Sequence, residues 1–300
     1  MRVLVSGSTG LIGSALVPAL TAAGHRVTRL VRAEPPSGED AVRWDPAAGT
    51  IDQAGLEGFD AVVHLAGENL AAKRWTPEQK ARIRDSRVRS TRVLCQALAQ
   101  LRQPPKVLLS ASAVGYYGDR GTEMLREETL PGSGFLADVA REWEAAAEPA
   151  RQRGIRVVHS RTGIVLTPKG GALAKLLLPF QLGLGGTFGT GSHYMSWIAL
   201  DDLLGAFVHA LATETLSGPV NVVAPNPVTN REFTDTFGRV LSRPVLLAVP
   251  KFVLRLALGE MADGALLTSQ RAVPDRLLAS GYRFRYPDLE GALRHVLGRE

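Results

Sequence analysis

The first residues suited to chemistry are three glycines near the start of the chain, spaced Gly-x-x-Gly-x-x-Gly. They follow an apolar run at 3–5, expected to be a strand, and they precede a run expected to be a helix. In that context glycines let the backbone approach a diphosphate, which backbone N–H groups and the helix dipole attract. We therefore predict a dinucleotide-binding turn, the alternative being a sharp turn without a ligand. Its residues are Gly7, Ser8, Thr9, Gly10, Leu11, Ile12 and Gly13.

The end of the second predicted strand, at 27–31, bears on which dinucleotide binds. Arg32 stands where an NAD-binding protein places an acidic side chain for the ribose 2′-hydroxyl. Because an arginine at this place suits a 2′-phosphate, we predict NADP as the cofactor. The alternative is that Arg32 is a solvated loop cation.

The strand expected at 61–65 ends in small residues that permit close approach to the adenosine half of a cofactor. Leu65, Ala66 and Gly67 are therefore predicted to bind it. His64 stands inside this apolar strand, where a lone histidine is more often structural than catalytic.

A long helix expected from Pro77 to about Leu101 carries six basic residues. At about 100° per residue they spread around the helix, and no aromatic residues interleave for stacking, so a nucleic-acid partner is not expected. Arg87 is predicted to reach the cofactor phosphates.

Short Val-, Leu- and Ile-rich strands alternate with helices up to about residue 166, which predicts an α/β protein with a parallel sheet covered on both faces. We expect a doubly wound Rossmann sheet over 1–166, with 197–225 rejoining it. A smaller mixed α/β annex on the substrate side is expected over 167–300. One helix is expected from Phe135 to about Arg153.

In the annex, the glycine-dense segment 183–192 is expected to be a loop that faces the substrate. Asp201 and Asp202 are expected to cap the helix that begins there. The weaker alternative is that this carboxylate pair takes part in acid–base catalysis.

The composition limits which kinds of protein this chain can be. The 300 residues are 45% hydrophobic, too apolar for a disordered chain, and 35 Lys and Arg against 29 Asp and Glu leave a net charge of +6. A basic balance permits an anionic partner without naming one. The single cysteine excludes an intramolecular disulfide, and no secretion signal or apolar run of about 20 residues is seen. We expect a cytoplasmic monomer or homodimer, without a membrane partner or a metal site.

Several longer segments are more specific than the glycine turn. They are SGSTGLIGSAL at 6–16, VVHLAGENL at 62–70, RWTPEQKARIRDSRVRSTRVL at 74–94, SASAVGYYGD at 110–119, GFLADVAREWEAAA at 134–147, LPFQLGLGG at 178–186, WIALDDL at 197–203 and GYRFRYPDLEGAL at 281–293. On these segments the chain resembles the extended short-chain dehydrogenase/reductase superfamily, and specifically its atypical epimerase-like family, related to nucleoside-diphosphate-sugar epimerases. The resemblance implies an NADP-binding Rossmann protein with a C-terminal domain of unknown function at about 247–295.

The chain departs from this superfamily at the catalytic positions. Active relatives use a Ser or Thr, then a Tyr and a Lys four residues later, and the Lys lowers the pKa of the Tyr. Ser112 matches the hydroxyl, with Ser110, expected at the cofactor, as a weaker substitute. Phe135 and Val139 stand at the Tyr and Lys positions, so the usual proton transfer cannot run from them.

Two functions therefore remain open. In the first, an NADP(H)-dependent epimerase or oxidoreductase acts on a small molecule, for which a sugar nucleotide is one candidate. Its acid or base would be Tyr116 or Tyr117, which lie beside glycines in a loop where a phenol can be exposed, although both could instead pack against the cofactor. Asp138 and Glu142 are more distant candidates. In the second, the protein binds NADP(H) as a regulator or interaction module without catalysis.

The resemblance also implies contacts at the nicotinamide end of the cofactor. Ile164 and Val165 follow the strand expected at 155–159, in the region where relatives meet this end.

Overall fold

A computed structural model describes residues 1–33 and 40–299 of the chain. The chain divides into two compact units, each assembled from three segments. The first unit holds 1–112, 139–160 and 207–220, and the second holds 113–138, 161–206 and 221–300. The domain limits expected at 166 and 167 stay predictions.

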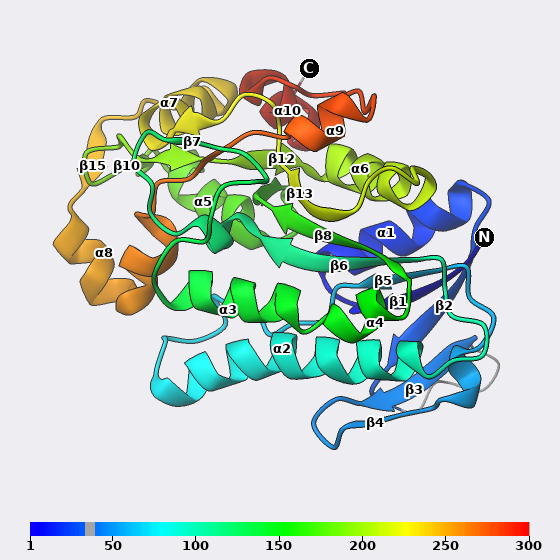
Figure 1. The fold of residues 1–300 in the computed structure, drawn as a ribbon. Helices are drawn as coiled ribbons and strands as arrows, with labels where there is room; N and C mark the ends of the chain where they lie inside the picture. Colours follow the sequence, from blue (N-terminus) through cyan, green and yellow to red (C-terminus); the bar gives the residue numbers. More distant parts are fainter. Residues whose placement is uncertain (34–39, 300) are drawn as a thin grey trace. The chain divides into compact units, whose positions relative to one another are not determined.

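An eight-stranded sheet dominates the first unit, with its strands in the order β13-β8-β6-β5-β1-β2-β3-β4 (Figure 1). The strands β3, β2, β1, β5 and β6 run parallel, and β4 pairs antiparallel to β3. The strand order reverses at β1, as in a doubly wound sheet, so the predicted fold class is confirmed. The strands are β1 (Arg2–Ser6), β2 (Arg26–Val31), β3 (Ala41–Asp45), β4 (Thr50–Ile51), β5 (Ala61–His64), β6 (Val107–Ala113), β8 (Arg156–Thr162) and β13 (Gly218–Val222).

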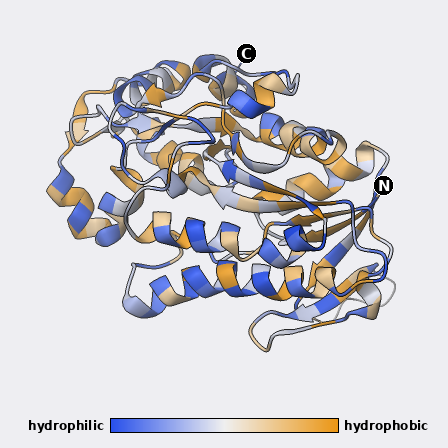
Figure 2. Cartoon of the chain, in the orientation of Figure 1, coloured by the Kyte–Doolittle hydropathy of each residue, from blue (hydrophilic) through white to orange (hydrophobic). Residues whose placement is uncertain are grey.

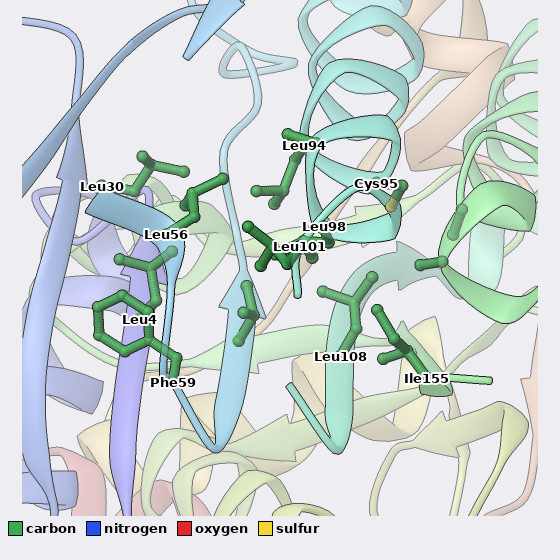
Figure 3. Close-up of a cluster of buried hydrophobic side chains, with 14 of the residues drawn as sticks. Leu4, Leu30, Leu56, Phe59, Leu94, Cys95, Leu98, Leu101, Leu108 and Ile155 are labelled. Carbon is green, nitrogen blue, oxygen red and sulfur yellow. The ribbon is translucent and has the colours of Figure 1, made fainter. Parts of the chain in front are cut away.

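One face of this sheet packs on the long helix α2 (Pro77–Ala99), which lies beside α4 (Glu148–Gln152). Figure 3 shows Leu4 and Leu108 of the strands against Leu94 and Leu98 of α2, and all four side chains are fully buried. Figure 2 shows the hydrophobic strands of the sheet, while α2 alternates between hydrophobic and hydrophilic residues. This pattern is typical of a helix that covers a core with one face.

The single helix expected from Phe135 to Arg153 is wrong. Two helices occur instead, α3 (Phe135–Ala145) and α4, which begins at Glu148. Pro149 stands in the first turn of α4, where its missing N–H does no harm, whereas inside a continuous helix it would break a hydrogen bond. The remaining elements associated with this unit are α1 (Leu11–Ala22), the short helix η1 (Ala54–Leu56) and α6 (Leu200–Ala212).

The second unit combines two-stranded pairs with helices around a core of its own. Phe180, Trp197, Phe233 and Phe237 are buried in that core together with Leu293 near the end of the chain. Its strand pairs are β9 (Ile164–Leu166) with β12 (Trp197–Ala199), β10 (Gly186–Phe188) with β15 (Leu247–Val249), β11 (Tyr194–Met195) with β14 (Val228–Thr229), and β7 (Met124–Leu125) with β16 (Arg271–Ala272). Its helical elements are η2 (Val114–Tyr117), α5 (Gly171–Gln181), α7 (Asn230–Leu241), α8 (Lys251–Leu258), η3 (Ala262–Leu266), α9 (Asp275–Ala279) and α10 (Leu289–Val296).

The segment 183–192 is not the continuous loop that its glycines predicted. Its central residues form β10, which pairs in parallel with β15. A Cβ on Gly186 would lie 2.6 Å from the carbonyl oxygen of Leu247, so here glycine permits a close strand pairing. Among the described helices, none is both long and apolar enough to cross a membrane.

Candidate functional site

The glycine turn lies between the end of β1 and the start of α1 in the first unit. Gly7 has φ +67°, and a Cβ there would lie 2.7 Å from the carbonyl carbon of Leu65. The Gly10 N–H donates to the Gly7 carbonyl at 3.0 Å, and a Cβ on Gly13 would come within 2.8 Å of the Ser8 Cα. Gly7 and Gly13 therefore each have a steric reason, and the predicted turn packs directly on the predicted loop at 65–67.

The start of α1 has the electrostatic character of an anion site. No side chain caps this helix, and its first turn holds no acidic residue, so no carboxylate offsets its dipole there. In parallel register, Ser6 of β1 pairs with His64 of β5 and with Leu30 of β2, so the three strands end at one edge of the sheet. This edge includes the point where the strand order reverses, where open α/β sheets bind ligands.

Arg32 follows the last residue of β2 and is exposed. The neighbouring β1 ends at the glycine turn, so Arg32 belongs to the same edge of the sheet. Its contact with a 2′-phosphate stays a prediction.

Arg87 of α2 is held beside the loop at 65–67. Its Nη2 donates to the Glu68 carbonyl at 2.9 Å and its Nη1 to the Ile83 carbonyl at 3.0 Å. The guanidinium also lies over the Trp143 ring, 5.2 Å from its centroid, and a Cβ on Gly67 would sit 3.3 Å from Cζ. Burial lowers the pKa of Arg87 to about 10, which leaves it charged at neutral pH. The loop therefore has a fixed positive charge at its end.

His64 is structural, as its place in an apolar strand predicts. It is fully buried, with Nδ1 2.7 Å from Ser6 Oγ and Nε2 3.0 Å from Thr91 Oγ1. The Ser6 Oγ also accepts the Leu65 N–H at 3.2 Å, and Thr91 Oγ1 accepts the Trp143 indole N–H at 2.9 Å. Burial lowers the pKa of His64 to about 4, so this network is neutral at pH 7. It ties the loop at 65–67 to both α2 and α3.

Ser112, at the end of β6, is buried, and its hydroxyl donates to Glu144 Oε1 at 2.7 Å. Glu144 lies on α3 and was not among the predicted candidates, because no spacing rule connects it with a residue 32 positions earlier. Glu142, which was a candidate, instead accepts two hydrogen bonds of 2.7 Å from Arg84. Asp138 lies in the first turn of α3.

Ser110 is fully buried in β6, where it pairs in register with His64. Among the described residues its Oγ has no hydrogen-bond partner. Its role at the cofactor stays a prediction.

The expectation of an exposed phenol is wrong for Tyr117, which belongs to the second unit. Tyr117 is fully buried, and its hydroxyl donates to Asn221 Oδ1 at 2.7 Å and accepts from Arg161 Nη1 at 3.0 Å. Burial raises the pKa of Tyr117 to about 12, so this phenol is a poor acid or base at neutral pH. Tyr116 is half-buried, with the Arg161 guanidinium 3.5 Å from its ring centroid.

A charged cluster that the sequence did not predict surrounds Tyr117. Arg161 is 3% exposed and donates to the Glu127 carbonyl at 3.0 Å. Glu127 is 2% exposed, and its Oε1 accepts the backbone N–H of Asn221 at 3.1 Å and of Arg276 at 3.2 Å. Burial raises the pKa of the Glu127 carboxyl. We call Tyr116, Tyr117, Glu127, Arg161 and Asn221 the charged cluster.

The predicted nicotinamide contacts, Ile164 and Val165, lie in β9 of the second unit. They pair with Trp197 and Ile198 of β12, and both are partly buried. Their contact with a cofactor stays a prediction.

Asp201 and Asp202 lie in the first turn of α6, but their side chains reach the C-terminal region. The carboxylate of Asp202, which is 1% exposed, accepts the backbone N–H of Arg285 at 2.7 Å and of Tyr286 at 2.9 Å. Asp201 lies 3.1 Å from His295 Nε2. Both carboxylates thus lie where they complement the helix dipole, as expected, but their hydrogen bonds go to the C-terminal region and do not cap α6. Within 1–33 and 40–299, no group of three or more His, Cys, Asp or Glu could hold a metal ion.

Comparison with known proteins places this geometry in a family. Residues 3–223 match the model of the NAD dependent epimerase/dehydratase family, and residues 249–296 match a domain of unknown function, DUF1731. The epimerase family protein MT2273 of Mycobacterium tuberculosis is 46% identical over 297 residues, covering 99% of this chain and 98% of the relative.

Two solved structures agree with this family assignment. The crystal structure of human epimerase family protein SDR39U1 (isoform 2) with NADPH has a TM-score of 0.90 at 37% identity and covers 100% of both chains. The nucleoside-diphosphate sugar epimerase of Corynebacterium glutamicum has a TM-score of 0.82 at 40% identity, covering 100% of this chain and 59% of that one. The predicted resemblance is confirmed: the chain belongs to the NAD dependent epimerase/dehydratase family, with a DUF1731 domain at its C-terminal end.

Proposed function

We propose that this protein binds NADP(H) at the glycine turn of the first unit and uses it in hydride chemistry on a small hydroxyl or carbonyl compound. The observation that carries the proposal is the glycine turn itself, in which Gly7 packs on the backbone of Leu65 and leads into a helix start without a side-chain cap or a carboxylate. The human relative crystallised with NADPH supports it. The residues proposed to hold the cofactor are Gly7, Ser8, Thr9, Gly10, Leu11, Ile12, Gly13, Arg32, Leu65, Ala66, Gly67, Arg87, Ser110, Ile164 and Val165.

Two fixed features favour the phosphorylated cofactor. Arg32 follows β2 without a carboxylate in its place, and Arg87 brings a second positive charge to the neighbouring loop. An arginine at the end of the second strand accommodates a 2′-phosphate, whereas an acidic residue would bind the ribose hydroxyls of NAD. NADP(H) is therefore the proposed ligand.

The proton of the reaction is assigned to Ser112 and Glu144. Bound NADP(H) supplies the acceptor or donor of the hydride. As a substrate alcohol is oxidised, its hydroxyl proton passes to Ser112 Oγ while the Ser112 proton passes to the Glu144 carboxylate, 2.7 Å away. Reduction of a carbonyl runs the same path backwards. Ser112 is the proposed catalytic residue, and Glu144 acts through it.

This assignment provides a proton path in place of the Tyr and Lys of the superfamily, which the sequence predicts to be missing. Val139 is buried and apolar at the lysine position, and Phe135 has no exchangeable proton at the tyrosine position. Tyr117 is withdrawn as a candidate because its hydroxyl is buried between Asn221 and Arg161. Tyr116 remains the weaker alternative to Ser112.

One experiment tests the cofactor and the proton path in turn. Fluorescence titration should show tighter binding of NADPH than of NADH, and the opposite order would refute the cofactor assignment. A panel of carbonyl compounds is then screened for NADPH oxidation by the wild type, Glu144→Gln and Glu142→Gln.

Glu144→Gln should lower turnover about a hundredfold, because a positioned acid or base is worth at least that much. Glu142→Gln is the matched control two positions earlier on α3, and it should stay within about threefold of the wild type, because Glu142 only pairs with Arg84 at the surface. Equal loss in both variants would refute the path. No turnover with intact NADPH binding would instead favour the non-catalytic regulator.

The cytoplasm remains the proposed location. Cys95 is buried, and burial raises the pKa of its thiol to about 12, so it is suited to a core position. The substrate is a small molecule whose identity the proposed experiment addresses through the carbonyl panel.

A further inference from the structure

Exposed apolar side chains gather on one part of the second unit. Eight of the twelve large hydrophobic residues that are exposed in the described chain fall within 178–184 and 246–256. Leu246 is 86% exposed and Leu256 77%, values unusual for residues that would gain from burial. We call the end of α5, β15 and α8 the apolar face, and its six most exposed members are Leu178, Leu182, Leu184, Leu246, Phe252 and Leu256.

These segments are neighbours within the second unit. Arg243 Nε donates to the Gln181 carbonyl at 2.8 Å, so the end of α5 touches the chain that leads into β15. β15 pairs with β10, which follows α5 after a short turn, and α8 begins directly after β15 (Figure 1). The exposed residues therefore belong to one region and are not scattered singly over the surface.

Helix α8 carries large apolar side chains on its exposed side as well as on its buried side. Leu254 points into the protein and is buried, whereas Phe252 and Leu256, four residues apart, are 68% and 77% exposed. A helix that only covers a core presents polar residues to water on its other side, but α8 presents a phenylalanine and a leucine. Its outer face is thus suited to an apolar environment.

Basic groups outnumber carboxylates around the apolar face. The segments 171–200 and 242–259 contain no Asp or Glu, but they contain Lys175, Arg243, Lys251 and Arg255. The exposed Glu260 follows directly after the second segment, and Arg255 is paired with Asp263. The hydrocarbon chain of Lys251 lies along Gly189, where a Cβ would be 3.0 Å from its Cγ. An excess of basic groups beside exposed apolar side chains complements a surface that is apolar inside and anionic outside.

A second copy of the chain meets this description poorly. A two-fold interface places the same patch on both sides, so it would bring the basic groups of one copy against those of the other. An anionic lipid surface offers acyl chains to the leucines and phosphate groups to the lysine and arginine side chains. We propose that the apolar face binds the interfacial layer of an anionic membrane, as a peripheral contact that needs no membrane-spanning helix. The proposal is independent of the NADP(H) function, and it replaces the expectation that the protein has no membrane partner.

The test is sedimentation of the full-length protein with lipid vesicles. The wild type is mixed with vesicles of phosphatidylcholine alone and of phosphatidylcholine and phosphatidylglycerol in equal parts. We expect binding to the anionic vesicles only, and release at high salt, because screening weakens attraction to the headgroups. Failure to bind anionic vesicles at low salt would overturn the proposal.

Two matched double variants locate the contact. Phe252→Ser with Leu256→Ser should weaken binding at least about tenfold, because two large apolar side chains are lost from the membrane. Leu130→Ser with Leu278→Ser, also at exposed positions of the second unit but outside the apolar face, should bind as the wild type does. Thermal unfolding and NADPH titration show whether each variant is folded.

Equal binding by both double variants would overturn the proposal, since the contact would lie elsewhere. Light scattering without lipid supplies the other decisive outcome. A wild-type dimer that becomes a monomer only in the Phe252→Ser, Leu256→Ser variant would show that a second copy covers the apolar face, against the membrane.

Discussion

Two buried polar networks, one in each unit, are built from different kinds of groups. In the first unit, Ser6, His64, Thr91 and Trp143 form a chain of neutral groups, with the pKa of His64 lowered to about 4. In the second, the charged cluster buries Arg161 and Glu127 almost completely. Neutral groups cost little to bury once they are hydrogen-bonded, whereas a charge must recover a much larger hydration energy. The first network can therefore lose a member at moderate cost, whereas loss of the buried Arg161 guanidinium from the second should cost much more.

The largest effect is expected for Arg161→Met. The change removes the guanidinium that donates to Tyr117 Oη and to the Glu127 carbonyl, leaving acceptors buried without their donor. Urea unfolding should show a loss of about 3–5 kcal/mol in the free energy of unfolding. Arg84→Met, which breaks an exposed pair with Glu142, is the control and should cost about 1 kcal/mol or less. Similar losses in both would remove the distinction between buried and exposed charge.

A smaller effect is expected for Thr91→Val in the neutral network. Valine keeps the shape but removes the hydroxyl oxygen that accepts the Trp143 indole N–H and lies 3.0 Å from His64 Nε2. The free energy of unfolding should fall by about 1–3 kcal/mol, the usual cost of buried donors without acceptors. The control is Thr21→Val on α1, where the hydroxyl donates only to a carbonyl of its own helix. If Thr91→Val cost no more than this control, the network would not hold α2 and α3 together.

The smallest effect, and one that depends on pH, is expected for Glu127→Gln. Burial raises the pKa of Glu127 in the folded chain above its unfolded value. Its contribution to stability is therefore fully present below the unfolded pKa and is lost as the pH rises through the folded pKa. Glutamine keeps an oxygen for the two backbone N–H donors and has no charge to bury.

Urea midpoints between about pH 4 and about pH 8 should thus improve for Glu127→Gln relative to the wild type as the pH rises. Glu123→Gln, at an exposed position, controls for the loss of one negative charge. A constant difference between Glu127→Gln and the wild type across this range would contradict the buried, pH-dependent charge.

Features that depend on a few neighbouring residues could be predicted from the sequence, whereas contacts between distant residues could not. The strands of the sheet are short apolar runs because both faces are covered, and the glycine turn depends on local backbone geometry, so both are visible over a few residues. Strand β3 was missed because its buried and exposed residues alternate over only five positions. Strand β10 was missed because its glycines serve close pairing with β15, 61 residues away in the register of Gly186 and Leu247.

The side-chain pairs were harder to predict, since they join distant positions. Tyr117 looked accessible beside its glycines, but its partners Asn221 and Arg161 lie 104 and 44 residues away. Glu144 became a candidate only when the fold placed it against Ser112. Local sequence predicted that the usual Tyr and Lys are missing, but it could not show which carboxylate lies against the serine.

The Asp202 carboxylate, buried and bound to the backbone of Arg285 and Tyr286, has a consequence for how the protein is made. The DUF1731 boundary at residue 249 divides sequence families, but it cuts through one folded body, whose core also takes Leu289 and Leu293 from the last helix. During synthesis on the ribosome, the second unit lacks these partners until residues 285–293 have emerged. The first unit, whose last segment ends at residue 220, has all of its strands earlier. The core of the second unit can therefore be completed only after the first unit has all of its strands.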